Sequence, residues 1–110
     1  NGAQPKVVSM SLGGERNNLE NKVVDRMVDQ GITVVVAAGN EATDACTKSP
    51  ASAAKAITVG SSDKWDEASD FTNFGPCVDI FAPGDVIHAA GISTPTAVVG
   101  MSGTSMATPA

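Results

Sequence analysis

The sequence has little of several residue types that particular functions need. Its 110 residues include no tyrosine, one tryptophan, one histidine and two cysteines, and only seven basic residues against twelve acidic ones. Because the formal net charge is −5 and no basic cluster is present, we do not expect binding to nucleic acid. The longest uncharged apolar run, residues 31–40, is far shorter than the roughly 20 residues of a membrane helix, so no membrane span is expected. No charged-then-apolar leader opens the sequence, so we expect no targeting signal.

The remaining composition is typical of a globular chain with tight turns. Hydrophobic residues make up 42% and charged residues 17%, and there are 11 glycines, which together exclude a disordered or collagen-like chain. A length of 110 residues suits one small domain or a piece of a larger one. Because no repeat and no linker is present, residues 1–110 are expected to form one unit.

The first third of the sequence predicts a strand, a helix and a second strand. Residues 6–12 form a short apolar run closed by two glycines, which indicates a buried strand. Apolar residues recur at spacings of three and four through residues 19–28, as in an amphipathic helix, with Asn17 and Gly31 as its expected caps. Residues 32–38 are β-branched and apolar without alternation, which predicts a parallel strand covered on both faces. This order within about 35 residues is typical of a βαβ crossover, and hence of an α/β fold.

The rest of the chain predicts shorter elements. Two further apolar runs, at residues 56–60 and 78–82, are expected to be strands. Residues 86–90 and 96–101 flank a turn and predict a hairpin. The small residues at 102–109 are of the kind that begin a tightly packed helix.

Two residues are candidates for catalysis. Ser105 follows Gly103 on an expected sharp turn into a helix, where a hydroxyl can be exposed as a nucleophile; the alternative is a serine that simply caps the helix. Asn40 follows a buried strand, and strand ends are where ligands bind in parallel α/β sheets. Its amide can donate to an oxyanion, but a turn asparagine is the more common use of Gly-Asn. Taken singly, each residue is better explained by a structural role, Ser105 as a helix cap and Asn40 as a turn residue.

Five motifs in a fixed order change that balance. They are Ser-Met-Ser-Leu-Gly-Gly at 9–14, Val-Ala-Ala-Gly-Asn at 36–40, Phe-Thr-Asn-Phe-Gly at 71–75, Phe-Ala-Pro-Gly at 81–84 and Gly-Thr-Ser-Met-Ala-Thr-Pro at 103–109. This order resembles the C-terminal half of the catalytic domain of subtilisin-like serine proteases, and most closely the proteinase K branch. The resemblance covers essentially the whole chain. It implies a three-layer α/β fold around a parallel sheet, of which residues 1–110 form a partial catalytic domain.

The resemblance implies peptide-bond hydrolysis and assigns the site. Ser105 is implied to be the nucleophile, and Asn40 the side-chain oxyanion donor, with the backbone amide of Ser105 as the second donor. One stretch is implied to pair with an extended peptide, and a second to form the opposite wall of the specificity pocket. The first stretch is Ser11, Leu12 and Gly13, and the second is Ala37, Ala38 and Gly39. Small walls imply a preference for large apolar or aromatic substrate side chains.

Two further features have structural explanations under the resemblance. Cys46 and Cys77 have no metal-type spacing, so they are either free thiols or one disulfide, and the resemblance favours the disulfide. A disulfide in turn implies secretion or a vacuole-like lumen. Asp79 lies in an apolar run, where it is either an outward-facing strand residue or a buried acid that needs a partner. The resemblance implies a structural calcium ion held by Asp79 and by the carbonyl groups of Ala54 and Ala56, although Ala54 stands where that branch often has proline.

The resemblance also implies what this chain lacks. In subtilisin-like proteases an Asp-Thr-Gly element and a His-Gly-Thr-His motif precede the serine, and neither occurs in residues 1–110. His88 lies in an apolar strand pattern and is not expected to be the general base. We therefore expect residues 1–110 to be inactive by themselves.

The expected partners follow from the same resemblance. It implies polypeptide substrates, a propeptide or protein inhibitors as further partners, a monomeric full-length enzyme, and no cofactor for catalysis.

One alternative is a non-catalytic homologue that binds extended peptides through the same edge. A second is an α/β-hydrolase, whose nucleophile motif needs glycine where this chain has Ala107.

Overall fold

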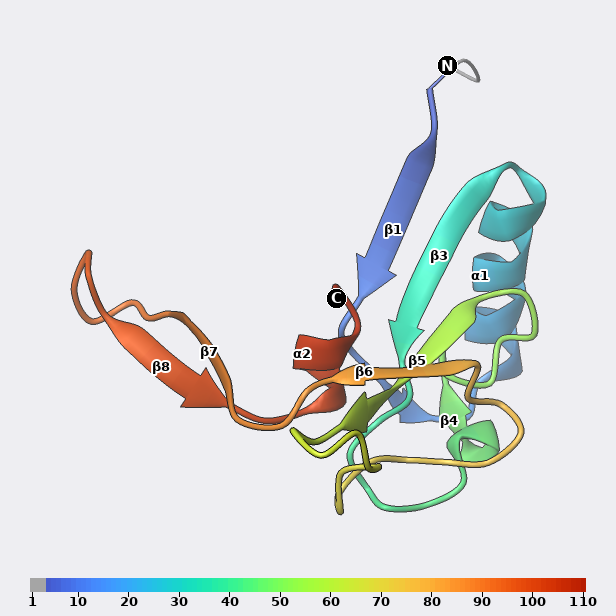
Figure 1. Cartoon of the computed structure of the whole chain (residues 1–110). Coiled ribbons are helices and arrows are strands. Elements are labelled where there is room, and N and C mark those ends of the chain that lie inside the picture. The colour runs from blue at the N-terminus through green and yellow to red at the C-terminus, as the bar shows by residue number, and fades with distance from the viewer. Residues whose placement is uncertain (1–3) are drawn as a thin grey trace.

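A four-stranded parallel sheet in the order β1–β3–β5–β6 forms the centre of the computed structural model, which describes residues 4–110 (Figure 1). Its strands are β1 (Lys6–Met10), β3 (Ile32–Ala37), β5 (Ile57–Ser62) and β6 (Ile80–Pro83). Met10 pairs with Val36 and Ala37 with Val59, so β1, β3 and β5 run in register toward one edge of the sheet. The expected α/β fold with a parallel sheet is therefore confirmed.

The helix α1 (Asn18–Asp29) makes the crossover from β1 to β3. Its predicted N-cap is confirmed, because the Asn17 side chain accepts a hydrogen bond from the Glu20 N–H at 3.1 Å. The reciprocal half of a capping box is absent, since the Asn17 N–H donates to Ser49 Oγ at 2.8 Å instead of to Glu20. None of the helices in residues 4–110 has the length and hydropathy of a membrane span.

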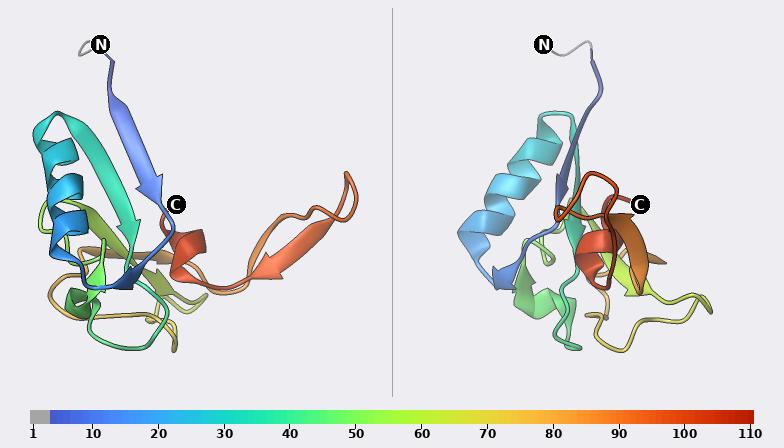
Figure 2. Two further views of the ribbon diagram at one scale, coloured as in Figure 1. Left: turned by 180° about the vertical axis from the view of Figure 1, so that it is seen from behind. Right: turned by 90° about the vertical axis from the view of Figure 1, so that its left-hand side faces the viewer.

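Helices lie on opposite sides of the sheet, which gives the expected three layers (Figure 2). On one face Val24 of α1 packs with Val34 and Val36 of β3 in a buried core cluster that also includes Ala53 and Ala56. On the other face, α2 (Thr104–Ala107) is the one helix among residues 4–110. This second face is therefore largely bare.

Short elements complete the fold. The pairs β2 (Gly14–Glu15) with β4 (Lys48–Ser49), and β7 (Ile87–Ala90) with β8 (Val98–Met101), are both antiparallel. The β7–β8 hairpin was expected, and it projects from the body of the molecule (Figure 1). The β2–β4 pair and the 3-10 turn η1 (Ala45–Thr47) were not predicted, because two- and three-residue elements carry no periodicity.

Two strand boundaries differ from the sequence prediction in ways that matter for the site. β1 ends at Met10 rather than at residue 12, so Ser11–Gly13 are exposed and unpaired by the sheet. β6 begins at Ile80 rather than at residue 78, which leaves Asp79 just before the strand. Residues that were expected inside strands therefore lie in the segments that border them.

Candidate active site

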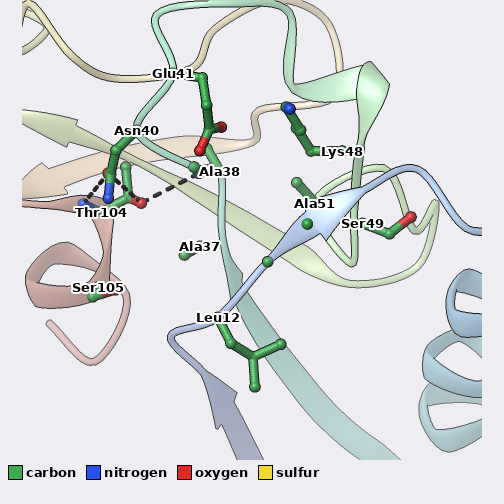
Figure 3. A pocket seen from close by; sticks show the side chains of 13 residues that line it. Leu12, Ala37, Ala38, Asn40, Glu41, Lys48, Ser49, Ala51, Thr104 and Ser105 are labelled. Atoms are coloured by element: carbon green, nitrogen blue, oxygen red, sulfur yellow. Dashed lines mark hydrogen bonds between the residues drawn. The ribbon is translucent and has the colours of Figure 1, made fainter.

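A pocket lies at the sheet edge where β1 and β3 end (Figure 3). Its cavity volume is about 120 Å³, which suits one side chain, since pockets for whole small molecules occupy roughly 300–1,000 Å³. Most of the predicted site residues line it, namely Leu12, Gly13, Ala37, Ala38, Gly39, Asn40 and Ser105. The fold thus brings together segments that are far apart in sequence.

Ser105 is the second residue of α2 and makes a reciprocal contact with Ser11. Its Oγ donates to the Ser11 carbonyl at 3.2 Å, and the Ser11 Oγ donates to the Ser105 carbonyl at 3.0 Å. Ser11 is not a lining residue, but this contact ties the segment after β1 directly to Ser105. The N–H of Ser105 lies in the first turn of α2, where the helix itself supplies no acceptor.

Gly103 sets the sharp entry into α2. Its φ of 156° and ψ of 158° fall in a region that is essentially restricted to glycine. A Cβ at this position would make only ordinary contacts, the nearest at 3.4 Å to Met106 Sδ, so the requirement for glycine is conformational rather than steric. The expected sharp turn before Ser105 is confirmed.

The Asn40 amide is oriented by Thr104, the residue before Ser105. Asn40 Oδ1 accepts hydrogen bonds from the Thr104 N–H and from Thr104 Oγ1, both at 2.8 Å. Thr104 Oγ1 in turn accepts from the Gly39 N–H at 3.2 Å. Because the amide oxygen is engaged by two donors, the amide nitrogen Nδ2 remains as the group with which Asn40 can donate. The motif contained Thr104, but nothing in the sequence pointed to this bond across 64 positions.

Two charged residues that the sequence did not single out, Glu41 and Lys48, also line the pocket. Lys48 Nζ donates to Glu15 Oε1 at 2.7 Å. This hydrogen bond is the largest cause that raises the pKa of Lys48 above its ordinary value, with a smaller contribution from the charge of Glu41. The small walls had suggested a pocket for apolar side chains, but its lining also contains these two charged residues. Neither residue belongs to a periodic stretch of the sequence, so no periodic signal marked them.

His88 lies outside this site, as expected. It is on β7 and lines a separate hollow together with Trp65 and Val86. Since His88 is the one histidine of the sequence, the described residues bring no imidazole to the pocket of Ser105.

The two cysteines form the disulfide that the resemblance favoured. Cys46 in η1 is bonded to Cys77, with 5.3 Å between their Cα atoms. Cys77 and Val78 pack against a second buried cluster that includes Ala38 at the base of the pocket. The bridge therefore joins the loop after Asn40 to the segment before β6.

Asp79 is exposed, so the idea that it is an acid buried inside a strand is wrong. Its Oδ2 accepts from the Thr58 N–H at 2.8 Å, and its own N–H donates to the Thr58 carbonyl at 2.9 Å. Residues 4–110 hold no cluster of three or more acidic, histidine or cysteine side chains arranged for a metal. The predicted calcium ligands are instead one carboxylate and backbone carbonyls of Ala54 and Ala56, an all-oxygen set of the type that calcium prefers.

Comparison with known proteins agrees with this geometry. Residues 2–110 match the model of the subtilase family, Peptidase_S8. The chain is 50% identical over 103 residues to "Subtilisin-like protease 2" of Pseudogymnoascus destructans, covering 94% of this chain and 26% of that protein. It is 47% identical over 109 residues to "Extracellular serine proteinase" of Thermus sp., covering 99% of this chain and 27% of that protein.

Solved structures give the same result. A cold-adapted subtilisin-like serine proteinase matches with a TM-score of 0.89 and 42% identity, over 99% of this chain and 39% of that one. The chain thus spans about a quarter of the length of these curated relatives. The ordered motifs, the parallel sheet and these matches agree, and the chain belongs to the subtilase family of subtilisin-like serine proteases, as the resemblance to the proteinase K branch predicted.

Proposed function

We propose that residues 1–110 are part of the catalytic domain of a serine endopeptidase, in which Ser105 is the nucleophile. Asn40 Nδ2 and the Ser105 N–H donate to the oxyanion that forms when the peptide carbonyl is attacked. One observation carries the proposal: Thr104 holds the Asn40 amide oxygen at 2.8 Å and is bonded to Ser105 along the chain. This arrangement fixes the donor and the nucleophile relative to each other.

The reaction needs two groups that residues 4–110 do not bring to the pocket. Ser105 Oγ bonds to the substrate carbonyl carbon while its proton passes to a histidine, which an aspartate orients; the histidine then protonates the leaving amine. We propose that both residues come from parts of the protein outside this chain. Ser105 Oγ must then exchange the Ser11 carbonyl, its present acceptor, for that histidine.

The substrate is proposed to be an extended polypeptide. Ser11, Leu12 and Gly13 are exposed and unpaired by the sheet, so their backbone groups, apart from the Ser11 carbonyl that Ser105 Oγ contacts, are available to a peptide strand. The substrate side chain before the cleaved bond enters the pocket between this segment and residues 37–39, whose small size leaves room for an apolar group. A propeptide or protein inhibitor would occupy the same edge.

We also propose that the protein is secreted, acts as a monomer and needs no cofactor for catalysis. The disulfide supports an oxidising compartment, and one relative is named an extracellular serine proteinase. A structural calcium ion at Asp79, Ala54 and Ala56 completes the proposal, and it would stabilise the segments that it joins rather than take part in the chemistry.

Labelling with a fluorophosphonate tests the nucleophile. The reagent bonds to an activated serine oxygen and releases fluoride, so it reports a serine whose proton is accepted by a base. We expect stoichiometric labelling in the full-length protein that contains this chain, none in its Ser105→Ala variant, and none in isolated residues 1–110.

The outcomes separate the alternatives. Labelling of the isolated chain at Ser105 would contradict the proposal that the base lies elsewhere. A folded full-length protein that binds peptides but is not labelled would be the non-catalytic peptide-binding homologue instead.

A further inference from the structure

Asn73 is a fully buried residue that the catalytic proposal does not use. It lies in the loop between β5 and β6, in the Phe-Thr-Asn-Phe-Gly motif, and its exposed fraction is 0%. A buried amide must satisfy two donors and two acceptor sites, and leaving them unpaired costs free energy. The hydrogen-bond partners of the Asn73 side chain all lie in one short segment, residues 38–43, which carries Asn40.

Asn73 contacts this segment on both sides of Asn40. On the N-terminal side of Asn40, the Asn73 Nδ2 donates to the Ala38 carbonyl at 2.8 Å, and the Asn73 backbone N–H donates to the Gly39 carbonyl at 2.9 Å. On the C-terminal side of Asn40, the Asn73 Oδ1 accepts from the N–H groups of Glu41 and Thr43, both at 3.0 Å. Nδ2 also donates to Glu41 Oε1 at 2.7 Å. Asn40 is thus the residue in the middle of a segment that Asn73 holds at both ends.

This segment has no regular structure of its own to fix it. β3 ends at Ala37 and η1 begins at Ala45, so the backbone groups in between depend on partners from elsewhere. Gly39 fits the arrangement, because its φ is 105° and a Cβ there would collide with the Asn73 amide. The close approach of residue 39 to Asn73 therefore requires glycine.

Contacts with Thr104 and with Asn73 together help to define the position of the Asn40 side chain. Thr104 holds the amide oxygen, and Asn73 holds the backbone before and after Asn40. An oxyanion donor must be placed to within a fraction of an ångström, since a displacement of about 1 Å can cost roughly 100-fold in rate. Loss of the Asn73 contacts would leave this backbone with fewer bonds, chiefly those from the N–H groups of residues 38, 39 and 42 to Val59, Thr104 and Phe71, while Thr104 and Ser105 keep their own sequence and contacts.

We propose that Asn73 is a positioning residue of the oxyanion hole, which acts through residues 38–43 on Asn40. This inference rests on the proposed function, in which Asn40 donates to the oxyanion. An aspartate at position 73 keeps the shape and the two accepted N–H bonds, but it replaces the amide nitrogen by an oxygen. That oxygen would face the Ala38 carbonyl and the Glu41 carboxylate, so the contact with the Ala38 carbonyl becomes repulsive.

A double-mutant cycle in the full-length protein tests the proposal. We expect Asn73→Asp to lower kcat by about 10- to 100-fold when Asn40 is present. In an Asn40→Ala background the same substitution should cost less than about threefold, because the donor that it misplaces is already absent. A purely structural role would lower kcat equally in both backgrounds.

Controls keep the outcomes distinct. Val24→Ala removes buried methyl groups from the core beneath α1, so it lowers stability without contact to the 38–43 segment and is expected to leave kcat unchanged. Equal losses for Asn73→Asp in both backgrounds would overturn the inference but not the proposed function. If Asn40→Ala by itself left kcat unchanged, the proposed function would fail first.

A second variant covers failure to fold. Asn73→Ser is made in parallel, since its smaller side chain introduces no charge. If neither variant accumulates as folded protein while Val24→Ala does, Asn73 is a determinant of folding and the positioning role is overturned.

Discussion

At the scale of single residues, the site depends on which end of an amide is free. Asn40 Oδ1 is engaged twice by Thr104, and the amide nitrogen Nδ2 is left as a donor beside Ser105. The same amide turned the other way round would present an oxygen to the proposed oxyanion and repel it. Thr104 therefore controls the position of the Asn40 amide and also which of its two polar atoms remains free to form a further hydrogen bond.

Replacement of Asn40 by alanine tests this donor. In the full-length protein we expect Asn40→Ala to lower kcat by roughly 10²–10³-fold, which is the known effect of losing one oxyanion-hole donor in subtilisin, a member of this same family. KM should change little, because the lost bond is made mainly in the transition state. Steady-state kinetics on a peptide substrate measure both constants, and a rise in KM at unchanged kcat would place Asn40 in substrate binding instead.

Asp79 supports a second prediction at this scale. Asp79→Asn retains an oxygen for the Thr58 N–H but removes the negative charge, so it isolates the role of the charge. If Asp79 binds calcium, added calcium raises Tm of the full-length protein and Asp79→Asn abolishes most of this rise. Asp70→Asn, an exposed aspartate in the loop before β6, is the matched control and should retain the full rise. An equal calcium response in both variants argues against the site.

The sequence indicated some of these residues and not others. Ser105 and Asn40 could be proposed as site residues because short motifs occur in a fixed order, which is information carried along the chain. Thr104, Asn73 and Glu41 make hydrogen bonds that join positions 30 to 65 residues apart. Such bonds have no periodicity and no local spacing, so no pattern in the sequence marks the pair.

At the scale of elements, the same distinction holds. The helix α1 was predictable because an apolar stripe, an asparagine cap and a terminal glycine all agree over twelve residues. The end of β1 was not, because the apolar run continues to Leu12 while the sheet pairing stops at Met10. Directly after the strand, Ser11 instead contacts Ser105, 94 residues away, and local sequence cannot encode such a contact.

The disulfide is a prediction at the scale of elements. Cys46 and Cys77 close a loop with a sequence separation of 31 residues, which contains β4 and β5. In the chain-entropy model, removal of the cross-link costs about 3–4 kcal/mol of unfolding free energy. The full-length Cys46→Ser/Cys77→Ser variant should show this loss in denaturant unfolding.

The control for this prediction is reduction of the disulfide. A thiol reductant should destabilise the unaltered protein to a similar extent and leave the double variant unaffected. A reductant-sensitive double variant would mean that the measured effect does not come from this bond.

At the scale of the whole molecule, residues 1–110 expose more surface than an independent domain of their mass. The accessible surface is 6742 Å², against roughly 5,700 Å² for a compact monomer. The radius of gyration is 14.5 Å, against about 13 Å. Much of the exposed apolar area lies on the sheet face opposite α1, where Val7, Ile57 and Ile80 are 68%, 41% and 56% exposed.

This bare face has the composition of an interior. Its groove runs along β1, β3, β5 and β6 to α2, and apolar side chains dominate its lining. The solved relative contains this fold as 39% of its chain, so a longer protein has further chain with which to cover the face. We therefore expect the face to be buried in the full-length protein, although it is exposed in residues 1–110.

A charge placed on this face distinguishes the two situations. Ile80→Lys should lower Tm of the full-length protein by roughly 10 °C or prevent its folding, because a buried and unpaired ammonium group is costly. Trp65→Lys is the control, since Trp65 is 72% exposed in the loop between β5 and β6 and should shift Tm by no more than about 2 °C. If Ile80→Lys were as mild as the control, the face would be solvent-exposed in the whole protein, and the excess surface would be a property of the native enzyme. A large and selective effect would instead mean that the sheet face opposite α1 becomes part of a second core, one that residues 1–110 only half supply.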